Sequence, residues 1–218
     1  MPGGEANFST TTAAGTTVAF DDDFDLKSKW GFGVRYTFRS PNGKHKLWAT
    51  YARTSASNTR TLSRTFVFLG QTYPVNLDTR SDTSLGIFLA SYAYRWGSKK
   101  IRIGPMAQVG WATARVELAA VTNTTIADRS GSISALAGTV GYDMDINPSD
   151  KFNIFNNVGF MALGKQRFIR GELGLRYYIT RNFGVSGGYQ FGKYKLTNND
   201  NYIQANESGP FVGGLVRF

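Results

Sequence analysis

The chain has 218 residues, 25 of them glycine, with 14% aromatic residues and no cysteine. This enrichment in glycine and rings favours an all-β fold, and the length favours a single domain spanning 1–218. The net charge is +10, but Lys and Arg are spread along the chain without a basic run, so we expect no nucleic-acid partner.

The amino-terminal segment carries the weakest signals. Met1–Glu5 has neither a basic start nor an apolar run, so we interpret the chain as a mature form without its targeting segment, with 1–7 disordered or foreign to the fold. Residues 6–20 can form a weak β segment. No run of 18 apolar residues exists in the chain, which excludes a transmembrane helix but not membrane strands of about 9–11 residues.

Nine clearer strands follow, each marked by apolar residues that alternate with small or polar ones. In the first of them, Phe32, Val34 and Tyr36 alternate with Gly33 and Arg35. Since single-chain bacterial barrels have an even number of strands, we count 6–20 as a tenth; eight is the alternative if the amino-terminal segment stays outside the barrel. The nine ranges are 28–39, 45–56, 83–96, 101–118, 131–146, 152–163, 168–180, 183–195 and 209–218.

The two faces of these strands differ in a consistent way. One face bears rings and aliphatic side chains, which suits lipid, and the other bears glycine, serine and charges, which suits a crowded or water-filled lumen. Two strands are ambiguous, and a β-bulge would switch their faces. The competing sets are Leu47, Ala49 and Tyr51 against Trp48, and Leu85, Ile87 and Leu89 against Phe88, Tyr92, Tyr94 and Trp96.

The connections alternate between short and long. Short turns are predicted at 40–44, 97–99, 147–150 and 180–182, and longer connections at 55–82, 119–130 and 195–208. Short periplasmic turns and long extracellular loops are typical of outer-membrane barrels. The last strand ends on Phe218, which resembles the assembly signal of outer-membrane proteins and implies the barrel assembly machinery as a partner.

These patterns together predict a transmembrane antiparallel up-and-down β-barrel of about ten strands in the bacterial outer membrane. Its expected surroundings are outer-membrane lipid and lipopolysaccharide, whose negative charge would attract a basic protein.

A family resemblance rests on motifs in roughly the first hundred residues. The motifs are Phe20-Asp21-Asp22-Asp23-Phe24-Asp25-Leu26, the strand pair through Tyr36-Thr37-Phe38 and His45-Lys46-Leu47, Thr61-Leu62-Ser63-Arg64, and Phe68-Leu69-Gly70-Gln71-Thr72-Tyr73-Pro74-Val75. In these the chain resembles a widespread group of uncharacterised proteobacterial outer-membrane β-barrel proteins, which are small and porin-like. The resemblance implies the fold and supplies no activity.

Catalytic and metal-binding residues are scarce. His45 is the single histidine and falls beside a predicted short turn, so we expect an exposed turn residue and no enzyme activity. The acidic cluster Asp21, Asp23 and Asp25 is a weak candidate for a divalent cation, because it lacks the glycine and distal glutamate of a calcium loop. We expect no cofactor.

Charges on the predicted inner faces are the more informative candidates for a lumen or constriction. They either form a salt-bridge network that plugs the barrel or line a narrow aqueous constriction that favours small anions. The candidates are Arg35, Arg102, Asp143, Arg170, Glu172, Arg176 and Arg217, with Arg39 and Asp145 on the same faces.

The connection 55–82 contains an apolar hairpin centred on Gly70-Gln71. It either packs over the barrel mouth or offers Phe66, Phe68 and Tyr73 to a hydrophobic solute or a partner. Two functions remain open. The first is a passive conduit or binding site for a small solute through a narrow, basic-leaning lumen. The alternative is a plugged barrel that presents its loops, including 195–208, to a partner protein or lipopolysaccharide.

Overall fold

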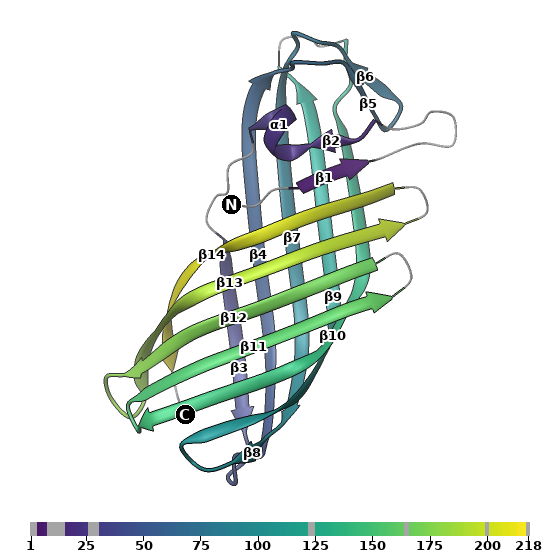
Figure 1. Ribbon diagram of the computed structural model, residues 1–218. Coiled ribbons are helices and arrows are strands. Elements are labelled where there is room, and N and C mark those ends of the chain that lie inside the picture. The colour runs from purple at the N-terminus through teal and green to yellow at the C-terminus, as the bar shows by residue number, and fades with distance from the viewer. Residues whose placement is uncertain are drawn as a thin grey trace.

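The computed structural model consists mainly of one large antiparallel sheet that curls around an axis, with one side standing taller than the other (Figure 1). The structure describes residues 4–7, 16–25, 31–121, 125–163, 166–198 and 201–216. No helix among these residues is long and apolar enough to cross a membrane. The predicted all-β antiparallel fold is confirmed.

Nine long strands follow one another around the sheet in chain order, each hydrogen-bonded to the next. They correspond one to one with the nine strands predicted from alternation. The short strand β8 (Trp96–Gly97) adds to β9. The nine strands are β3 (Phe32–Arg39), β4 (His45–Thr61), β7 (Asp78–Tyr94), β9 (Ile101–Ala120), β10 (Arg129–Ser149), β11 (Phe152–Leu163), β12 (Gln166–Tyr178), β13 (Phe183–Asn198) and β14 (Asn201–Val216).

The outer face carries a belt of exposed apolar side chains. The register lines up Tyr51, Phe88, Trp111 and Leu136 on four neighbouring strands, and each of these side chains is 40–52% exposed. On β9 the belt runs from Ile101 to Trp111, about 33 Å along the strand at ~3.3 Å per residue, or ~25 Å across a membrane at a tilt of about 40°. This height matches the apolar band of a transmembrane barrel.

The connections define two ends of the molecule. At the turn end, β3 joins β4 through 40–44, β10 joins β11 through 150–151, and β12 joins β13 through 179–182. At the opposite loop end, the predicted long connections 55–82 and 119–130 shrink to 62–77 and 121–128. The predicted loop 195–208 is wrong, because β13 and β14 pair up to Asn198 and Asn201.

Four strands, β4, β7, β9 and β10, are longer than predicted because they continue beyond the belt. We call the segment in which β4, β7, β9 and β10 rise beyond the row Tyr51–Phe88–Trp111–Leu136 the extension (Figure 1). Here the polarity of the two faces is reversed. The outer face turns polar, with Arg53, Ser84 and Arg115, whereas the inner face is apolar and buried, with Leu85 and Val116.

This reversal explains one of the two ambiguous strands, β7. In β7, Leu85 and Ile87 face inward within the extension, as does Leu89 just on the turn side of Phe88, and Tyr92 and Tyr94 face outward within the belt. The pairing of β7 with β9 is continuous from Thr79 to Ala93, so the suggested bulge is absent there. In β4, Leu47 and Tyr51 face outward and Trp48 inward.

The amino-terminal segment differs from both sequence predictions. Gly4–Asn7, expected to be disordered or foreign to the fold, forms β1, which pairs antiparallel with Tyr202–Ala205 of β14. The predicted tenth barrel strand over 6–20 is represented by the short strand β2 (Val18–Ala19), which pairs with β1; 8–15 lies outside the described residues. The short helix α1 (Phe20–Phe24) follows.

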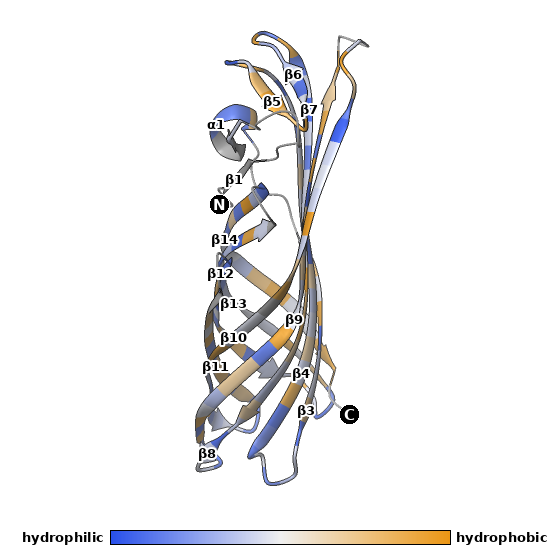
Figure 2. Cartoon of the chain, turned by 90° about the vertical axis from the view of Figure 1, so that its right-hand side faces the viewer, coloured by the Kyte–Doolittle hydropathy of each residue, from blue (hydrophilic) through white to orange (hydrophobic). Residues whose placement is uncertain are grey.

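A hairpin closes the concave side of the extension. Strands β5 (Phe66–Phe68) and β6 (Gln71–Tyr73) pair with each other around Leu69 and Gly70, both with positive φ. Figure 2 shows this hairpin and α1 on the same side of the tall strands. The extension is therefore a small sheet with its own covered core.

Candidate functional site

The interior of the barrel near the turn end holds a cluster of buried charges centred on Asp143 and Asp145 of β10. The Lys46 Nζ lies 2.6 Å from Asp143 Oδ1 and 3.7 Å from Asp145 Oδ2. The Arg95 guanidinium pairs with both carboxylates and also donates to the Gly43 carbonyl at 3.1 Å. Asp143 is 0% exposed and Arg95 is 2% exposed, so the pairs lie beyond the reach of solvent.

Two further arginines complete the cluster on the Asp145 side. Arg176 Nη1 donates to Asp145 Oδ1 at 3.3 Å and to Asn153 Oδ1 at 2.8 Å, and its guanidinium stacks 3.8 Å from the centre of the Phe155 ring. Arg39 Nη2 reaches Asp145 Oδ2 at 3.3 Å from β3. We call Arg39, Lys46, Arg95, Asp143, Asp145 and Arg176 the ion-pair plug.

A second ion pair lies nearer the middle of the barrel. Arg35 on β3 donates two hydrogen bonds, of 2.5 and 2.7 Å, to the carboxylate of Glu172 on β12, and Asn157 donates to the same carboxylate at 2.6 Å. A neutral chain runs beside them, in which Thr139 donates to Gln108 at 2.8 Å and Gln108 donates to Ser91 at 2.9 Å.

This arrangement suits a packed structural interior. A buried charge is tolerated only when it is paired and hydrogen-bonded, because desolvation is costly. Every carboxylate oxygen of Asp143, Asp145 and Glu172 has such a partner. The side chains join β3 and β4 to strands across the barrel, so they hold opposite walls together.

Beyond the plug the interior becomes an apolar cluster, which we call the loop-end core. Phe66 and Tyr73 stack with ring centres 5.3 Å apart, Phe24 meets Phe66 edge-on at 5.7 Å, and Phe168 lies 4.7 Å from Tyr194. The remaining members include Leu62, Phe68, Leu77, Leu85, Ile87, Leu89, Ala112, Ala114, Val116, Leu118, Ile133, Ala135, Leu196 and Ile203.

Polar contacts fix the covering hairpin and α1 in place. The Tyr73 hydroxyl donates to the carbonyls of Leu118 and Ala127, 3.2 Å away in each case, and burial raises the pKa of Tyr73 to about 12. The Arg64 guanidinium holds Asp23 through bonds of 2.7 and 2.8 Å, and this hydrogen-bonded pairing raises the pKa of Arg64.

The predicted lumen residues separate into three groups. Arg35, Asp143, Glu172 and Arg176 come together in the buried network, as the salt-bridge alternative predicts. Arg170 lies half-buried on the inner face of β12, two residues before Glu172. Arg102 lies at the turn end, where it donates to the Asn42 carbonyl at 2.9 Å. Arg217 and Phe218 lie outside the described residues.

The loop and acidic candidates have structural partners. Phe66, Phe68 and Tyr73 are at most 1% exposed, so they pack in the loop-end core instead of offering an exposed apolar surface. Asp23 is held by Arg64, and no group of three or more metal-binding side chains gathers in the part of the chain that the structure describes. The cation site predicted weakly at Asp21, Asp23 and Asp25 stays a prediction, because the side chain of Asp21 lies outside the described residues.

Sequence reasoning missed Lys46, Arg95, Asn153 and Asn157. Lys46 alternates with Leu47 and shares the inner face with Trp48, whose ring lies 5.0 Å from Lys46 Nζ. Arg95 falls in the strand whose faces were ambiguous. Leu89 faces inward, and so does every second residue after it, namely Ser91, Ala93 and Arg95. Assigning Leu89 to the inner face would therefore have predicted the inward placement of Arg95.

His45 is exposed at the turn end, as predicted. Its Nδ1 lies 2.9 Å from the Tyr92 hydroxyl, and its ring lies edge-on to Tyr94. Together with Trp96, which is 53% exposed, these rings form a cluster at one edge of the belt, where aromatic girdles of membrane barrels occur.

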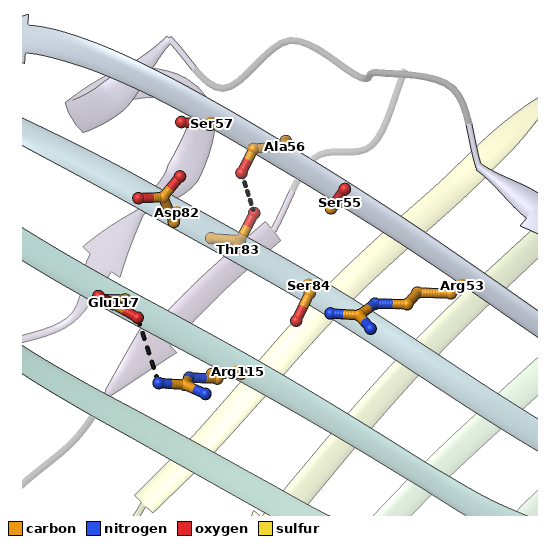
Figure 3. A pocket seen from close by; sticks show the side chains of 9 residues that line it. All are labelled: Arg53, Ser55, Ala56, Ser57, Asp82, Thr83, Ser84, Arg115 and Glu117. Carbon is orange, nitrogen blue, oxygen red and sulfur yellow. Dashed lines mark hydrogen bonds and ion pairs between the residues drawn. The ribbon is translucent and has the colours of Figure 1, made fainter.

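A shallow hollow of about 430 Å³ lies on the outer face of the extension (Figure 3). Arg53 and Arg115 project from β4 and β9 on either side of Ser84, and Arg115 pairs with Glu117 at 3.2 Å. The hollow lies directly beyond the row Tyr51–Phe88–Trp111, because Arg53 pairs with Gly86 and Gly86 with Thr113 in the next row.

Comparisons with known proteins support the fold. No family model matches the chain, and no curated protein matches it. The translocator domain of the autotransporter NalP from Neisseria meningitidis is 12% identical, with the match covering 100% of this chain and 86% of that domain at a TM-score of 0.51. Ail, the attachment invasion locus protein of Yersinia pestis, is also 12% identical, covering 100% of this chain and 95% of Ail at a TM-score of 0.47.

The similarity to NalP is one of architecture. At this identity it establishes the antiparallel transmembrane barrel fold and leaves the activity of this chain to its own residues.

Proposed function

We propose that the protein is a plugged outer-membrane barrel that anchors a folded surface at the membrane and has no open channel. The burial of Asp143 and Arg95 carries this proposal, because charges that line an aqueous channel are exposed to water. The loop-end core adds a second barrier, since its side chains fill the interior where a solute would have to enter. A conduit for a solute would require both the ion-pair plug and the loop-end core to move out of the interior.

The location and the surroundings are part of the proposal. A belt about 25 Å high suits the bacterial outer membrane, with lipid around the belt and lipopolysaccharide around the extension. The barrel assembly machinery would insert such a protein. We include no enzymatic role, because His45 faces outward at the turn end; loss of a hydrolytic activity on His45→Ala would contradict this.

Conductance in planar lipid bilayers tests the plug. We expect the purified protein to give no single-channel steps. A variant carrying Lys46→Ser, Arg95→Ser, Asp143→Ser and Asp145→Ser should give small steps, because it removes most of the ion-pair plug. The matched control Arg80→Ser with Asp82→Ser removes an exposed pair on the outer face and should stay silent.

The opposite result would support the conduit. Steps from the unmodified protein, with an ion preference that reverses on Arg176→Glu, would show that the buried charges line a conducting path.

The hollow at Arg53 and Arg115 supports lipopolysaccharide as the partner of the extension. Guanidinium groups just beyond the belt lie at the height of headgroup phosphates, which they bind well. Lipopolysaccharide should raise the unfolding temperature of the protein in detergent, and Arg53→Ser with Arg115→Ser should reduce that rise. Arg102→Ser at the turn end is the matched control. An equal rise in all three proteins would exclude a role for the hollow.

A further inference from the structure

The turns that join strands at the turn end carry an excess of positive charge. Four of them lie within the described residues, at 40–44, 98–100, 150–151 and 179–182. Each contains a lysine or an arginine, whereas Asp150 is the single acidic residue in all four. Their cations are all exposed, and we call them the basic rim. The basic rim consists of Lys44, Lys99, Lys100, Lys151 and Arg181.

The outer face of the extension, by contrast, is balanced in charge. Strands β4, β7 and β9 turn three arginines and three carboxylates to that face. These are Arg53, Arg80, Arg115, Asp78, Asp82 and Glu117. The excess of positive charge is therefore a property of the turn end and not of every polar surface of the protein.

The turns are held by their own polar side chains, and their cations have no counter-charge. Asn42 Oδ1 accepts a hydrogen bond from the Lys44 backbone N–H at 3.0 Å, and Ser98 Oγ accepts one from the Lys100 backbone N–H at 3.2 Å. Within the described ranges, no member of the basic rim forms an ion pair with a carboxylate. A row of unneutralised cations attracts anions from outside the protein.

The basic rim lies directly beside the belt. Lys100 is followed by Ile101, and Arg181 lies two residues from both Ile179 and Phe183, all three of which are exposed members of the belt. One or two residues amount to ~3–7 Å along a strand. The headgroup region on each side of the hydrocarbon is about 5–8 Å thick, so these cations lie at the level of lipid headgroups.

The cations are also spread around the barrel. The strands follow one another in chain order, so neighbouring turns are two strands apart, or about 10 Å at ~4.8 Å between strands. Figure 1 shows the turns one after another along this rim. A compact partner would contact one side of such a ring, whereas membrane lipid surrounds it.

We propose that the basic rim binds the phosphates of anionic phospholipids in the membrane leaflet at the turn end. Ammonium and guanidinium groups bind phosphate well, and clusters of cations beside a membrane select anionic over zwitterionic lipid. Short turns of bacterial barrels face the periplasm, so the lipid would belong to the periplasmic leaflet. This surface is separate from the hollow at Arg53 and Arg115, which lies at the opposite edge of the belt.

Quenching of tryptophan fluorescence by brominated lipid tests the proposal. Trp96 is exposed two residues before the turn 98–100, and the backbone N–H of Arg95 beside it donates to the Lys44 carbonyl at 2.7 Å. Trp30→Phe, Trp48→Phe and Trp111→Phe leave Trp96 as the one tryptophan of the chain. Vesicles that mix brominated phosphatidylglycerol with phosphatidylcholine, and the reverse, give the relative affinity of the two lipids at Trp96.

We expect phosphatidylglycerol to bind beside Trp96 about fivefold more tightly than phosphatidylcholine, the effect of one cation at an anionic surface. Lys99→Ser with Lys100→Ser should bring the ratio close to one, and Lys99→Arg with Lys100→Arg should keep it. The matched control is Arg80→Ser with Lys193→Ser. It removes two exposed cations at the loop end and should also keep the ratio.

Three results would overturn the proposal: a ratio of one in the protein with the intact rim, an unchanged ratio after Lys99→Ser with Lys100→Ser, or an equal loss in the control. Co-sedimentation with purified peptidoglycan that requires Lys99 and Lys100, without a lipid preference, would assign the rim to that polymer. If neither brominated lipid quenched Trp96, the belt itself would not contact lipid. None of these outcomes depends on whether the interior conducts or the hollow binds lipopolysaccharide.

Discussion

The barrel and the extension use the same strands with opposite polarity. In the barrel, β7 and β9 turn Tyr92 and Trp111 outward and Ser91 and Gln108 inward. In the extension the same two strands turn polar residues outward, such as Asp82 and Arg115, and apolar residues inward, such as Leu85 and Val116. The register between the strands continues through the change without a shift.

The difference shows that the surrounding solvent decides which face is apolar. A β-strand fixes only that neighbouring side chains point to opposite faces. Where lipid surrounds the sheet, apolar side chains face outward and paired charges fill the inside. Where water surrounds it, the hydrophobic effect turns the apolar face inward, and the β5–β6 hairpin covers it.

The largest effect should come from breaking the ion-pair plug. Asp145→Asn leaves Arg39, Lys46, Arg95 and Arg176 around one remaining carboxylate, Asp143. Removing one partner of a buried ion pair costs about 3–5 kcal/mol, because the remaining charges are uncompensated. The free energy of unfolding in urea, measured in lipid vesicles, should fall by that amount.

The control for this variant is Asp82→Asn in the extension. Asp82 pairs with Arg80 at 2.9 Å, but both side chains are at least a third exposed, so we expect a change of ~0–1 kcal/mol. Equal losses from the two variants would mean that the barrel interior is hydrated, which contradicts the comparison.

A smaller effect should distinguish the outer face of the belt, which contacts lipid, from the outer face of the extension, which contacts water. Leu173 is 54% exposed in the belt on β12, and Leu173→Arg should cost ~2–4 kcal/mol if lipid covers this position. Ser130→Arg changes an exposed outer residue of the extension opposite Glu117 and should cost ~0–0.5 kcal/mol. The same urea titration measures both. If Leu173→Arg is neutral, the ring-bearing face does not contact lipid.

The sequence predicts the belt well and the extension poorly, for one physical reason. In the belt, large apolar side chains alternate with small ones, and the nine strands are recognisable from that contrast. Beyond Tyr51 and Ala52, β4 continues as Arg53-Thr54-Ser55-Ala56-Ser57, where both faces lack large apolar side chains. The strand nature of this stretch comes from pairing with β7, which is a long-range contact that local alternation does not contain.

The candidate site shows the same limit. Arg35, Asp143, Glu172 and Arg176 lie on strands whose faces are unambiguous, and their inward placement is predictable. Arg95 follows directly after β7, where the apolar face changes sides along the strand, so the sequence alone does not decide which face Arg95 shares. Which carboxylate each cation meets depends on how the barrel brings β4 opposite β10, and no local pattern records that.

The smallest effect concerns the covering hairpin of the extension. Tyr73→Phe removes the hydroxyl that donates to Leu118 and Ala127, at a cost of ~1–2 kcal/mol.

Tyr73→Phe should also change how the stability of the hairpin responds to alkaline pH. Burial raises the pKa of Tyr73 to about 12, against ~10 in the unfolded chain. The folded state therefore keeps its proton longer, and the stability gained from this group is complete below pH 10 and is lost as pH rises toward 12. Protease sensitivity of the hairpin between pH 9 and 12 should thus rise less steeply in Tyr73→Phe than in the unmodified protein, whereas Tyr36→Phe, on the exposed edge of the belt, should leave the profile unchanged. Identical profiles for all three proteins would mean that the Tyr73 hydroxyl is hydrated and the loop-end core is open to water.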